Sequence, residues 1–317
     1  METTNWTQVD IFTTTVGLEP VGAALMDVGF PAFAIQDAAD FEQFLEGKNG
    51  HWDYIDDDLM KLREAETTIT VYLPDNQQGV DGLAAIREML LRLKGLDGES
   101  LWGRLECQLT GVQEEDWAFA WKKYYKPVKT GERLVICPSW EEYMAGENEV
   151  VMRLDPGMAF GTGTHDSTRL CLGALEDVVT GGEAVLDIGC GSGILSIGAL
   201  LLGAGSAVGV DIDQVAVRVA GENAELNGLA DKTQFHCGDL AEKVTGQYDI
   251  VCANIVADII MRFAPDVPRY LKKGGHFLTS GIIDARADEV LEAVKAQGFT
   301  LKSRRDSGGW VALLFVL

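Results

Sequence analysis

The stretch Val185-Leu-Asp-Ile-Gly-Cys-Gly-Ser-Gly193 decides the fold of this 317-residue chain. A strand pattern over 184–188 runs into three closely spaced glycines, and an apolar helix pattern follows over 194–202. Glycines at a turn between a strand and a helix permit tight backbone geometry and let a ligand approach the chain closely. The stretch therefore predicts a ligand-binding turn at the edge of a parallel sheet.

The spacing of these glycines narrows the class of ligand that the turn can bind. Dinucleotide-binding turns follow G-x-G-x-x-G, whereas this turn reads G-x-G-x-G and has an acid, Asp187, two residues before its first glycine. A nearby carboxylate favours a cationic ligand with an amino-acid tail over a pyrophosphate. The first predicted cofactor-binding residues are Asp187, Gly189, Gly191 and Gly193.

Strand and helix patterns alternate on from this turn. Strand patterns cover 184–188, 207–211, 233–237, 249–254 and 276–280, and helix patterns cover 194–202, 214–227, 258–271 and 285–297. Near-continuous apolar strands between helices predict a parallel sheet covered on both faces. Residues 299–306 and 310–317 read as strands joined at Ser307-Gly-Gly309, which indicates an antiparallel hairpin. The predicted class is α/β, with a mostly parallel doubly wound sheet that ends in this hairpin.

Polar residues end the next three strands. Asp211 lies twenty-two residues after Gly189, and its two oxygens can accept both hydroxyls of a ribose, as in nicotinamide enzymes as well. We expect Asp239 to accept a hydrogen bond from an adenine amino group. Asn254 is predicted to bind the cofactor and to act at the reaction centre. The alternative is that Asn254 caps the following helix.

The loop Leu154-Asp-Pro-Gly-Met-Ala-Phe-Gly-Thr-Gly-Thr-His165 precedes the turn and leads into a helix pattern over 167–175. Its glycines can act as hinges that let the loop cover a cofactor. We predict cofactor contacts at Phe160 and Gly161 of the loop and at Thr168 in the first turn of the helix. His165 is a candidate catalytic proton acceptor, and the alternative is that it holds the loop in place.

Three strings in the same order resemble the ribosomal protein L11 (L-eleven) methyltransferase family (PrmA type). They are the loop that ends at His165, Asp187-Ile-Gly-Cys-Gly-Ser-Gly-Ile-Leu195 and Ala253-Asn-Ile255, and the resemblance covers roughly residues 127–317. It implies a Rossmann-like class I methyltransferase domain that uses S-adenosyl-L-methionine, with contacts at Thr168, Gly189, Asp211 and Asn254. One departure from the family pattern is Asp166, where we expect proline.

The same resemblance implies an acceptor. It implies trimethylation of lysine side chains and of the N-terminal amine of ribosomal protein L11, which a preceding domain recognises, and it implies a monomer. Asn254 in Asn-Ile-Val differs from the Asn/Asp-Pro-Pro-Tyr/Phe form of many methylases that act on planar nitrogens. An aliphatic amine is therefore the expected acceptor, on the free rather than the assembled ribosomal protein.

The N-terminal part has a different pattern. Strand-like runs cover 6–15, 29–35, 67–73 and 105–112, with helix patterns over 17–27 and 80–93. Two strand–helix–strand units predict a smaller α+β, ferredoxin-like domain over 1–112, elaborated by an insertion at about 37–66. Residues 113–126 are predicted to form a linker helix that ends before Pro127, and residues 127–317 to form the methyltransferase domain.

The net charge of −23 bears on whether the chain binds nucleic acid or a basic protein. Residues 1–112 contain 20 acidic and 7 basic side chains, so this domain is strongly acidic. Such a surface repels phosphate backbones and attracts basic proteins, which argues against direct nucleic-acid binding. The chain has no long apolar run and no signal-like start, so we expect a cytoplasmic protein away from membranes. Six scattered cysteines without a Cys-x-x-Cys pair predict free thiols and no metal site.

Four other functions compete with the predicted protein-lysine N-methyltransferase. A methyltransferase of RNA is disfavoured by the negative charge, and one of a small metabolite by the additional domain. A nicotinamide oxidoreductase is disfavoured by the glycine spacing. A catalytically silent binding protein is disfavoured by the complete set of polar residues at the strand ends.

Overall fold

The computed structural model describes residues 6–30, 32–37, 66–74, 76–110, 126–155, 161 and 163–317. The chain divides into two compact units, residues 1–75 with 85–117 and residues 76–84 with 118–317. The predicted insertion at 37–66 and the predicted linker helix at 113–126 lie almost wholly outside the described residues, as does Phe160. No helix in the described part of the chain is long and apolar enough to cross a membrane.

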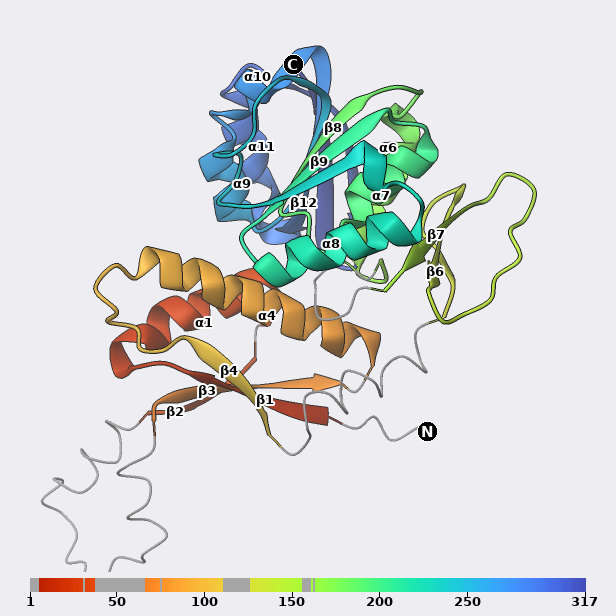
Figure 1. Ribbon diagram of the computed structural model, residues 1–317. Helices are drawn as coiled ribbons and strands as arrows, with labels where there is room; N and C mark the ends of the chain where they lie inside the picture. Colours follow the sequence, from red (N-terminus) through yellow and green to blue (C-terminus); the bar gives the residue numbers. More distant parts are fainter. Residues whose placement is uncertain are drawn as a thin grey trace, which may run out of the picture. The chain divides into compact units, whose positions relative to one another are not determined.

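The first unit contains a four-stranded antiparallel sheet in the order β2-β3-β1-β4. Its strands are β1 (Trp6–Phe12), β2 (Ala34–Gln36), β3 (Thr68–Pro74) and β4 (Glu106–Thr110). Helix α1 (Leu18–Asp27) follows β1, and α4 (Gln77–Leu96), which belongs to this unit from Ala85 onward, follows β3 (Figure 1). The β-α-β-β-α-β order with β1 and β3 central confirms the predicted ferredoxin-like arrangement.

The main sheet of the second unit has seven strands in the order β10-β9-β8-β11-β12-β14-β13. The strands are β8 (Ala184–Ile188), β9 (Ser206–Asp211), β10 (Thr233–Cys237), β11 (Tyr248–Asn254), β12 (Leu271–Ile283), β13 (Thr300–Ser307) and β14 (Trp310–Val316). Neighbours from β10 to β12 are parallel, and β14 is antiparallel to both strands beside it. The predicted parallel sheet with an antiparallel C-terminal hairpin is confirmed.

Helices cover both faces of this sheet. Helices α6 (Asp166–Val178), α7 (Ile194–Leu202) and α8 (Gln214–Leu226) contact one another in series, and α9 (Ala257–Phe263), α10 (Val267–Tyr270) and α11 (Ala287–Lys295) form the other set. The predicted continuous helix over 258–271 is wrong, because the chain breaks between α9 and α10. Pro265 and Pro268 have no N–H to donate within a helix, and their rings clash with the preceding turn.

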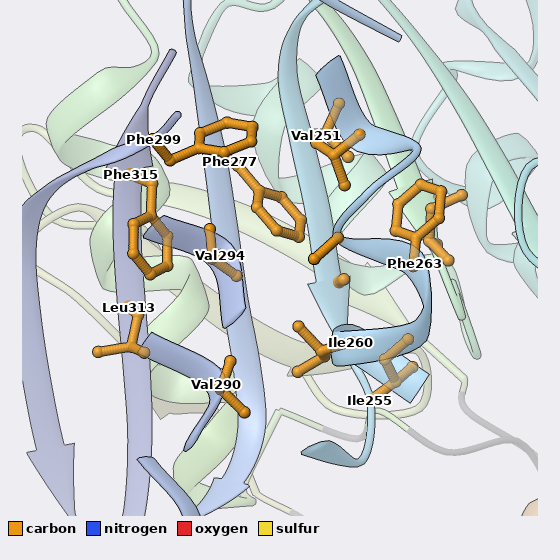
Figure 2. Packing of buried hydrophobic residues seen from close by; sticks show 14 of the residues in the cluster. Val251, Ile255, Ile260, Phe263, Phe277, Val290, Val294, Phe299, Leu313 and Phe315 are labelled. Carbon is orange, nitrogen blue, oxygen red and sulfur yellow. The ribbon is translucent and has the colours of Figure 1, made fainter. Parts of the chain in front are cut away.

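The face covered by α9 and α11 holds a large apolar core (Figure 2). Phe277 of β12 lies at its centre, with ring centroids 6.5 Å from Phe263, 5.7 Å from Phe299 and 6.3 Å from Phe315. Burying each such ring contributes roughly 1.5–3 kcal/mol. Odd-numbered residues of β11, such as Val251, point into this core. Because side chains alternate along a strand, Asn254 points to the opposite face, where α6 packs.

A small three-stranded sheet precedes the main one and was not predicted. It consists of β5 (Val128–Lys129), β6 (Leu134–Pro138) and β7 (Val150–Leu154), in that order. Glu176 of α6 accepts the backbone N–H groups of Glu132, Arg133 and Leu134 at 2.7, 2.9 and 2.7 Å. This support comes from more than 40 residues away, so a local pattern cannot reveal it.

Candidate active site

The glycine turn joins β8 to α7 with a backbone that favours glycine. Gly189, Gly191 and Gly193 have φ values of 71°, 52° and 81°, in the left-handed region. A Cβ on Gly189 would lie 2.3 Å from Cγ2 of Ile255, and one on Gly193 would lie 3.0 Å from Cβ of Ala220. Conformation and space therefore both require glycine at 189 and 193, and conformation favours glycine at 191.

Asp187 lies fully buried beneath the turn. Its Oδ2 accepts hydrogen bonds from the backbone N–H and the hydroxyl of Ser196, at 3.1 and 2.8 Å. Burial raises the pKa of Asp187 to about 6, against the lowering effect of the Ser196 hydrogen bonds. Its Oδ1 is buried and has no hydrogen-bond partner among the described residues. An unsatisfied buried acceptor is destabilising, so a ligand that donates to Oδ1 would remove this penalty.

Asp211 at the end of β9 holds the turn from the neighbouring strand. Its Oδ2 accepts the N–H of Gly191 at 2.8 Å, and its Oδ1 accepts the N–H of Asp213 at 2.9 Å. The residue is only 4% exposed. Two backbone donors therefore orient this carboxylate at the carboxyl edge of the sheet, where folds of this kind bind ligands.

Asn254 at the end of β11 contacts α6. Its Nδ2 lies 3.4 Å from Oγ1 of the buried Thr168, to which it donates. Its Oδ1 is buried without a partner in the described part of the chain. The alternative role as a cap for the next helix is wrong, because the N-cap of α9 is Val256 and has no side-chain hydrogen bond.

His165 is the N-cap of α6. Its Nδ1 accepts the backbone N–H of Ser167 at 3.3 Å and lies 2.8 Å from the hydroxyl of the same residue. Its ring packs edge-on against Trp310, 4.7 Å between centroids. Because Nδ1 accepts a backbone N–H, the neutral ring carries its proton on Nε2. Burial lowers the pKa of His165, although Asp166 opposes this effect.

Asp166, the residue that departs from the family pattern, also has a structural contact. Its carboxylate accepts a hydrogen bond from the hydroxyl of Ser307 at 2.9 Å. The carboxylate lies in the first turn of α6, where a negative charge interacts favourably with the helix dipole. Asp166 therefore ties the start of α6 to the C-terminal hairpin.

The remaining predicted residues differ in where they lie. The carbonyl of Gly161 accepts a 2.6 Å hydrogen bond from the hydroxyl of Ser192, which attaches the loop to the glycine turn. Asp239 follows β10 and pairs with Arg262 of α9 at 2.7 Å, with both side chains nearly half exposed. Within the described residues, no hydrogen bond joins Asp239 to the turn.

Asn223 of α8 is a further residue of the candidate site that was not predicted from the sequence. Its Nδ2 donates to the carbonyl of Ser192 at 3.0 Å, and its Oδ1 accepts the N–H of Asp155 at 2.9 Å. It is 1% exposed, so both contacts are internal. Asn227, one turn later, is bonded in the same way to the backbone of Arg153. Two asparagines four residues apart on one helix face were the available signal.

Together these residues suit a ligand rich in hydrogen-bond donors. Adjacent strands β8 and β11 each supply a buried oxygen without a partner, Oδ1 of Asp187 and of Asn254, and β9 supplies the Asp211 carboxylate. Such acceptors fit a molecule that carries an ammonium group and ribose hydroxyls. The described residues include no group of three or more side chains that could hold a metal ion.

Comparisons with known proteins agree with this chemistry. The family model "Ribosomal protein L11 methyltransferase (PrmA)" matches residues 5–317. Relatives named ribosomal protein L11 methyltransferase include one from Desulforamulus reducens, 40% identical over 99% of both chains, and one from Caldanaerobacter subterraneus subsp. tengcongensis, 41% identical over 98% of both. A solved structure of a ribosomal protein L11 methylase from Lactobacillus delbrueckii subsp. bulgaricus is 32% identical, with a TM-score of 0.57 over 61% of this chain and 97% of that one.

Proposed function

Because this chain belongs to the ribosomal protein L11 methyltransferase family, we propose that it transfers methyl groups from S-adenosylmethionine to lysine side chains and to the N-terminal amine of ribosomal protein L11. The observation that carries the proposal is the match of residues 5–317 to the family. The two unpartnered buried oxygens at the ends of β8 and β11 support a donor-rich cofactor at this place.

Each residue at a strand end would contact a different part of the cofactor. S-adenosylmethionine, when bound, supplies an electrophilic methyl group on a sulfonium. Asp211 would accept the ribose hydroxyls, and Asp187 with the turn of Gly189, Gly191 and Gly193 would accommodate the amino-acid tail. Thr168 of α6 and Asn254 of β11, which are joined by a hydrogen bond, would contact the same ligand. Asp239 would bind the adenine amino group, and Gly161 would contact the cofactor from the loop; the predicted contact at Phe160 lies outside the described residues.

The chain's contribution to the reaction is mainly to position the amine. A lysine ammonium has no lone pair, so it must lose its proton before it can attack. Burial beside a positive charge lowers the pKa of that lysine, which makes a dedicated base unnecessary. The proton that the ammonium loses passes to solvent. In the first and second transfers Oδ1 of Asn254 accepts one N–H of the incoming amine and aligns its lone pair, and alignment of this kind can supply several kcal/mol of barrier reduction. The neutral dimethylated amine has no N–H, so this hydrogen bond does not guide the third transfer.

Repeated methylation requires that the amine can rotate between transfers. A single acceptor at Asn254 leaves the partly methylated amine free to turn, whereas a ring of acceptors would hold it. The contacts of Nδ1 of His165 with Ser167 support a role for this histidine in holding α6 rather than as a base. Asn254 is therefore the proposed catalytic residue, and His165 the structural one.

The acceptor is free ribosomal protein L11, recognised by the N-terminal unit. Assembled L11 would bring ribosomal RNA with it, and a chain of net charge −23 repels phosphate. The same charge favours a basic protein partner and disfavours direct nucleic-acid binding. We place the enzyme in the cytoplasm, as a monomer.

Isotope-labelled S-adenosylmethionine tests the substrate assignment. The full chain is incubated in parallel with free L11, with assembled large ribosomal subunits and with protein-free ribosomal RNA. We expect label on free L11 and much less on assembled subunits. Label on RNA alone would replace this proposal with the competing RNA methyltransferase.

A further inference from the structure

The four-stranded sheet of the N-terminal unit has one face that is partly exposed. Residues alternate along β1, so Val9 and Ile11 are buried while the intervening side chains point to the other face. Cross-strand pairing places neighbours from β3 and β4 on that same face. We call it the Asp10 face and define it by Trp6, Gln8, Asp10, Thr70, Tyr72 and Thr110.

Asp10 lies on the central strand of this face and is held by three side chains. Oγ1 of Thr70 donates to it at 2.7 Å, and Oγ1 of Thr110 donates at 2.6 Å. Nε2 of Gln8 lies 2.9 and 3.0 Å from its two oxygens. Donors from β1, β3 and β4 therefore fix the orientation of one carboxylate in the middle of the sheet.

These hydrogen bonds keep the carboxylate charged. Partial burial raises the pKa of Asp10, but the hydrogen bonds from Thr110, Thr70 and Gln8 bring it below its ordinary value. No lysine, arginine or histidine in the described ranges forms an ion pair with it. Asp10 is thus an oriented negative charge, and its bonds with the described residues come from the neutral donors Gln8, Thr70 and Thr110.

Two aromatic side chains lie on the same face. Tyr72 is directly opposite Gln8 in the register, and Trp6 lies two residues before Gln8 on β1, opposite Pro74. Trp6 is 60% exposed and Tyr72 is 54% exposed. Aromatic faces attract cations and pack against the methylene stems of lysine and arginine. Tyr72 is diagonal to Asp10 across the β1–β3 pair, and a fixed carboxylate with an exposed aromatic ring at this position is a combination that recognises a long cationic side chain.

We propose that the Asp10 face is the docking surface for a lysine- or arginine-bearing segment of the protein substrate. Asp10 takes the cationic head group and Tyr72 covers its aliphatic stem, while Trp6, further along β1, offers an aromatic surface to a neighbouring side chain of the segment. Charge complementarity identifies the occupant, since residues 1–112 carry 20 acidic and 7 basic side chains and ribosomal proteins carry basic residues for binding RNA. This inference rests on the proposed function, because it concerns recognition of the same substrate.

Steady-state kinetics with free L11 test the docking surface. Three variants of the full chain are compared: Asp10→Asn and Tyr72→Ser on the face, and Glu19→Gln as a matched control. Glu19 is an exposed acid on α1 of the same unit, so its variant makes the same change in charge away from the face. We expect KM for L11 to rise roughly tenfold in Asp10→Asn and about threefold in Tyr72→Ser. The kcat value and the affinity for S-adenosylhomocysteine should stay unchanged, and Glu19→Gln should match the wild type.

The outcomes separate this inference from the proposed function. If the wild-type chain does not methylate L11, the proposed function fails. If the wild type is active and both face variants keep its KM, the docking surface alone is wrong. Should Asp10→Asn fail to fold, Tyr72→Ser decides, because the Tyr72 side chain is exposed on the sheet surface. A self-associating chain whose dimer is lost in Tyr72→Ser would instead assign the face to a second copy of the chain.

Discussion

The backbone N–H of Gly191 donates a 2.8 Å hydrogen bond to Oδ2 of Asp211, and this bond joins the glycine turn to the end of the neighbouring strand. The other oxygen of the same carboxylate accepts the N–H of Asp213 at 2.9 Å. One side chain therefore organises both the turn and the start of α8. A residue placed in this way shapes the turn, and in the proposed function it also contacts the cofactor.

Replacing Asp211 should abolish most cofactor affinity. In Asp211→Ala, we expect the Kd for S-adenosylhomocysteine to rise roughly 100-fold, which corresponds to two hydrogen bonds to a charged acceptor at about 1.5 kcal/mol each. Isothermal titration calorimetry measures this directly. Asp213→Ala is the matched control, since it removes the cap of α8 and about 1 kcal/mol of stability but should leave the affinity near that of wild type. Equal losses in both variants would refute the assignment of Asp211.

The glycine at 189 should be irreplaceable for stability as well as binding. A methyl group there meets Ile255 at 2.3 Å, in a backbone with φ of 71°, so Gly189→Ala should lower the free energy of unfolding by at least about 1–2 kcal/mol. Gly221 in α8 is the control, because a Cβ there has nothing within 4 Å. Gly221→Ala should stabilise the chain by about 0.5–1 kcal/mol. Urea unfolding of both variants provides the comparison, and an unaffected Gly189→Ala would contradict the crowding at the turn.

The buried Asp187 predicts a pH dependence of stability in the absence of cofactor. Its pKa in the folded chain is about 6, above the ordinary value of 3.8, because burial disfavours the charged form. The folded chain therefore binds the proton more tightly than the unfolded chain does. The stability associated with the protonated side chain is fully present below pH 4 and is lost as the pH rises through about 6.

For a pKa shift of this size, the free energy of unfolding should fall by about 3 kcal/mol between the acidic and the neutral end of this pH range. Urea unfolding at a series of pH values from 4 to 7 measures it, with Asp187→Asn as the comparison. As the pH rises across this range, we expect the wild type to lose stability relative to Asp187→Asn. A constant difference would mean that Asp187 does not titrate there.

His165 should act as a helix cap. His165→Asn keeps a capping side chain, so we expect kcat within about twofold of wild type and an unchanged pH profile. His165→Ala should lose about 1 kcal/mol of stability and retain most of kcat. A fall in kcat of a hundredfold or more in His165→Asn, with the acidic limb of the pH profile removed, would restore its role as a proton acceptor.

Much of the fold was predictable because its signals are local. The glycine turn at 189–193 and the apolar strands that follow it predict the parallel sheet, and Ser307-Gly-Gly309 predicts the hairpin. The small sheet of β5, β6 and β7 was missed, because its strands are short and its turn is supported from a distance by Glu176. The helix predicted over 258–271 was too long, because its apolar residues recur at helical spacing. Pro265 and Pro268 cannot donate the backbone hydrogen bonds that one continuous helix would need.

The site was predictable where residues end strands and much less so elsewhere. Asp187, Asp211 and Asn254 were identified because parallel strands bring their carboxyl ends to one edge. Asn223 was missed, because its two bonds, to Ser192 and Asp155, connect segments that are distant in sequence. The pairing of Asp239 with Arg262 likewise depends on where α9 packs, which strand patterns do not reveal.

Mass spectrometry of purified L11 after incubation with the full chain and S-adenosylmethionine tests the central claim most directly. The account predicts that L11 gains mass in whole methyl groups, up to three per amine, on peptides that contain lysine or the N-terminus. The Asn254→Ala variant should give far less product while it still folds. Unmodified L11 after incubation with a wild-type chain that binds S-adenosylhomocysteine would contradict the account.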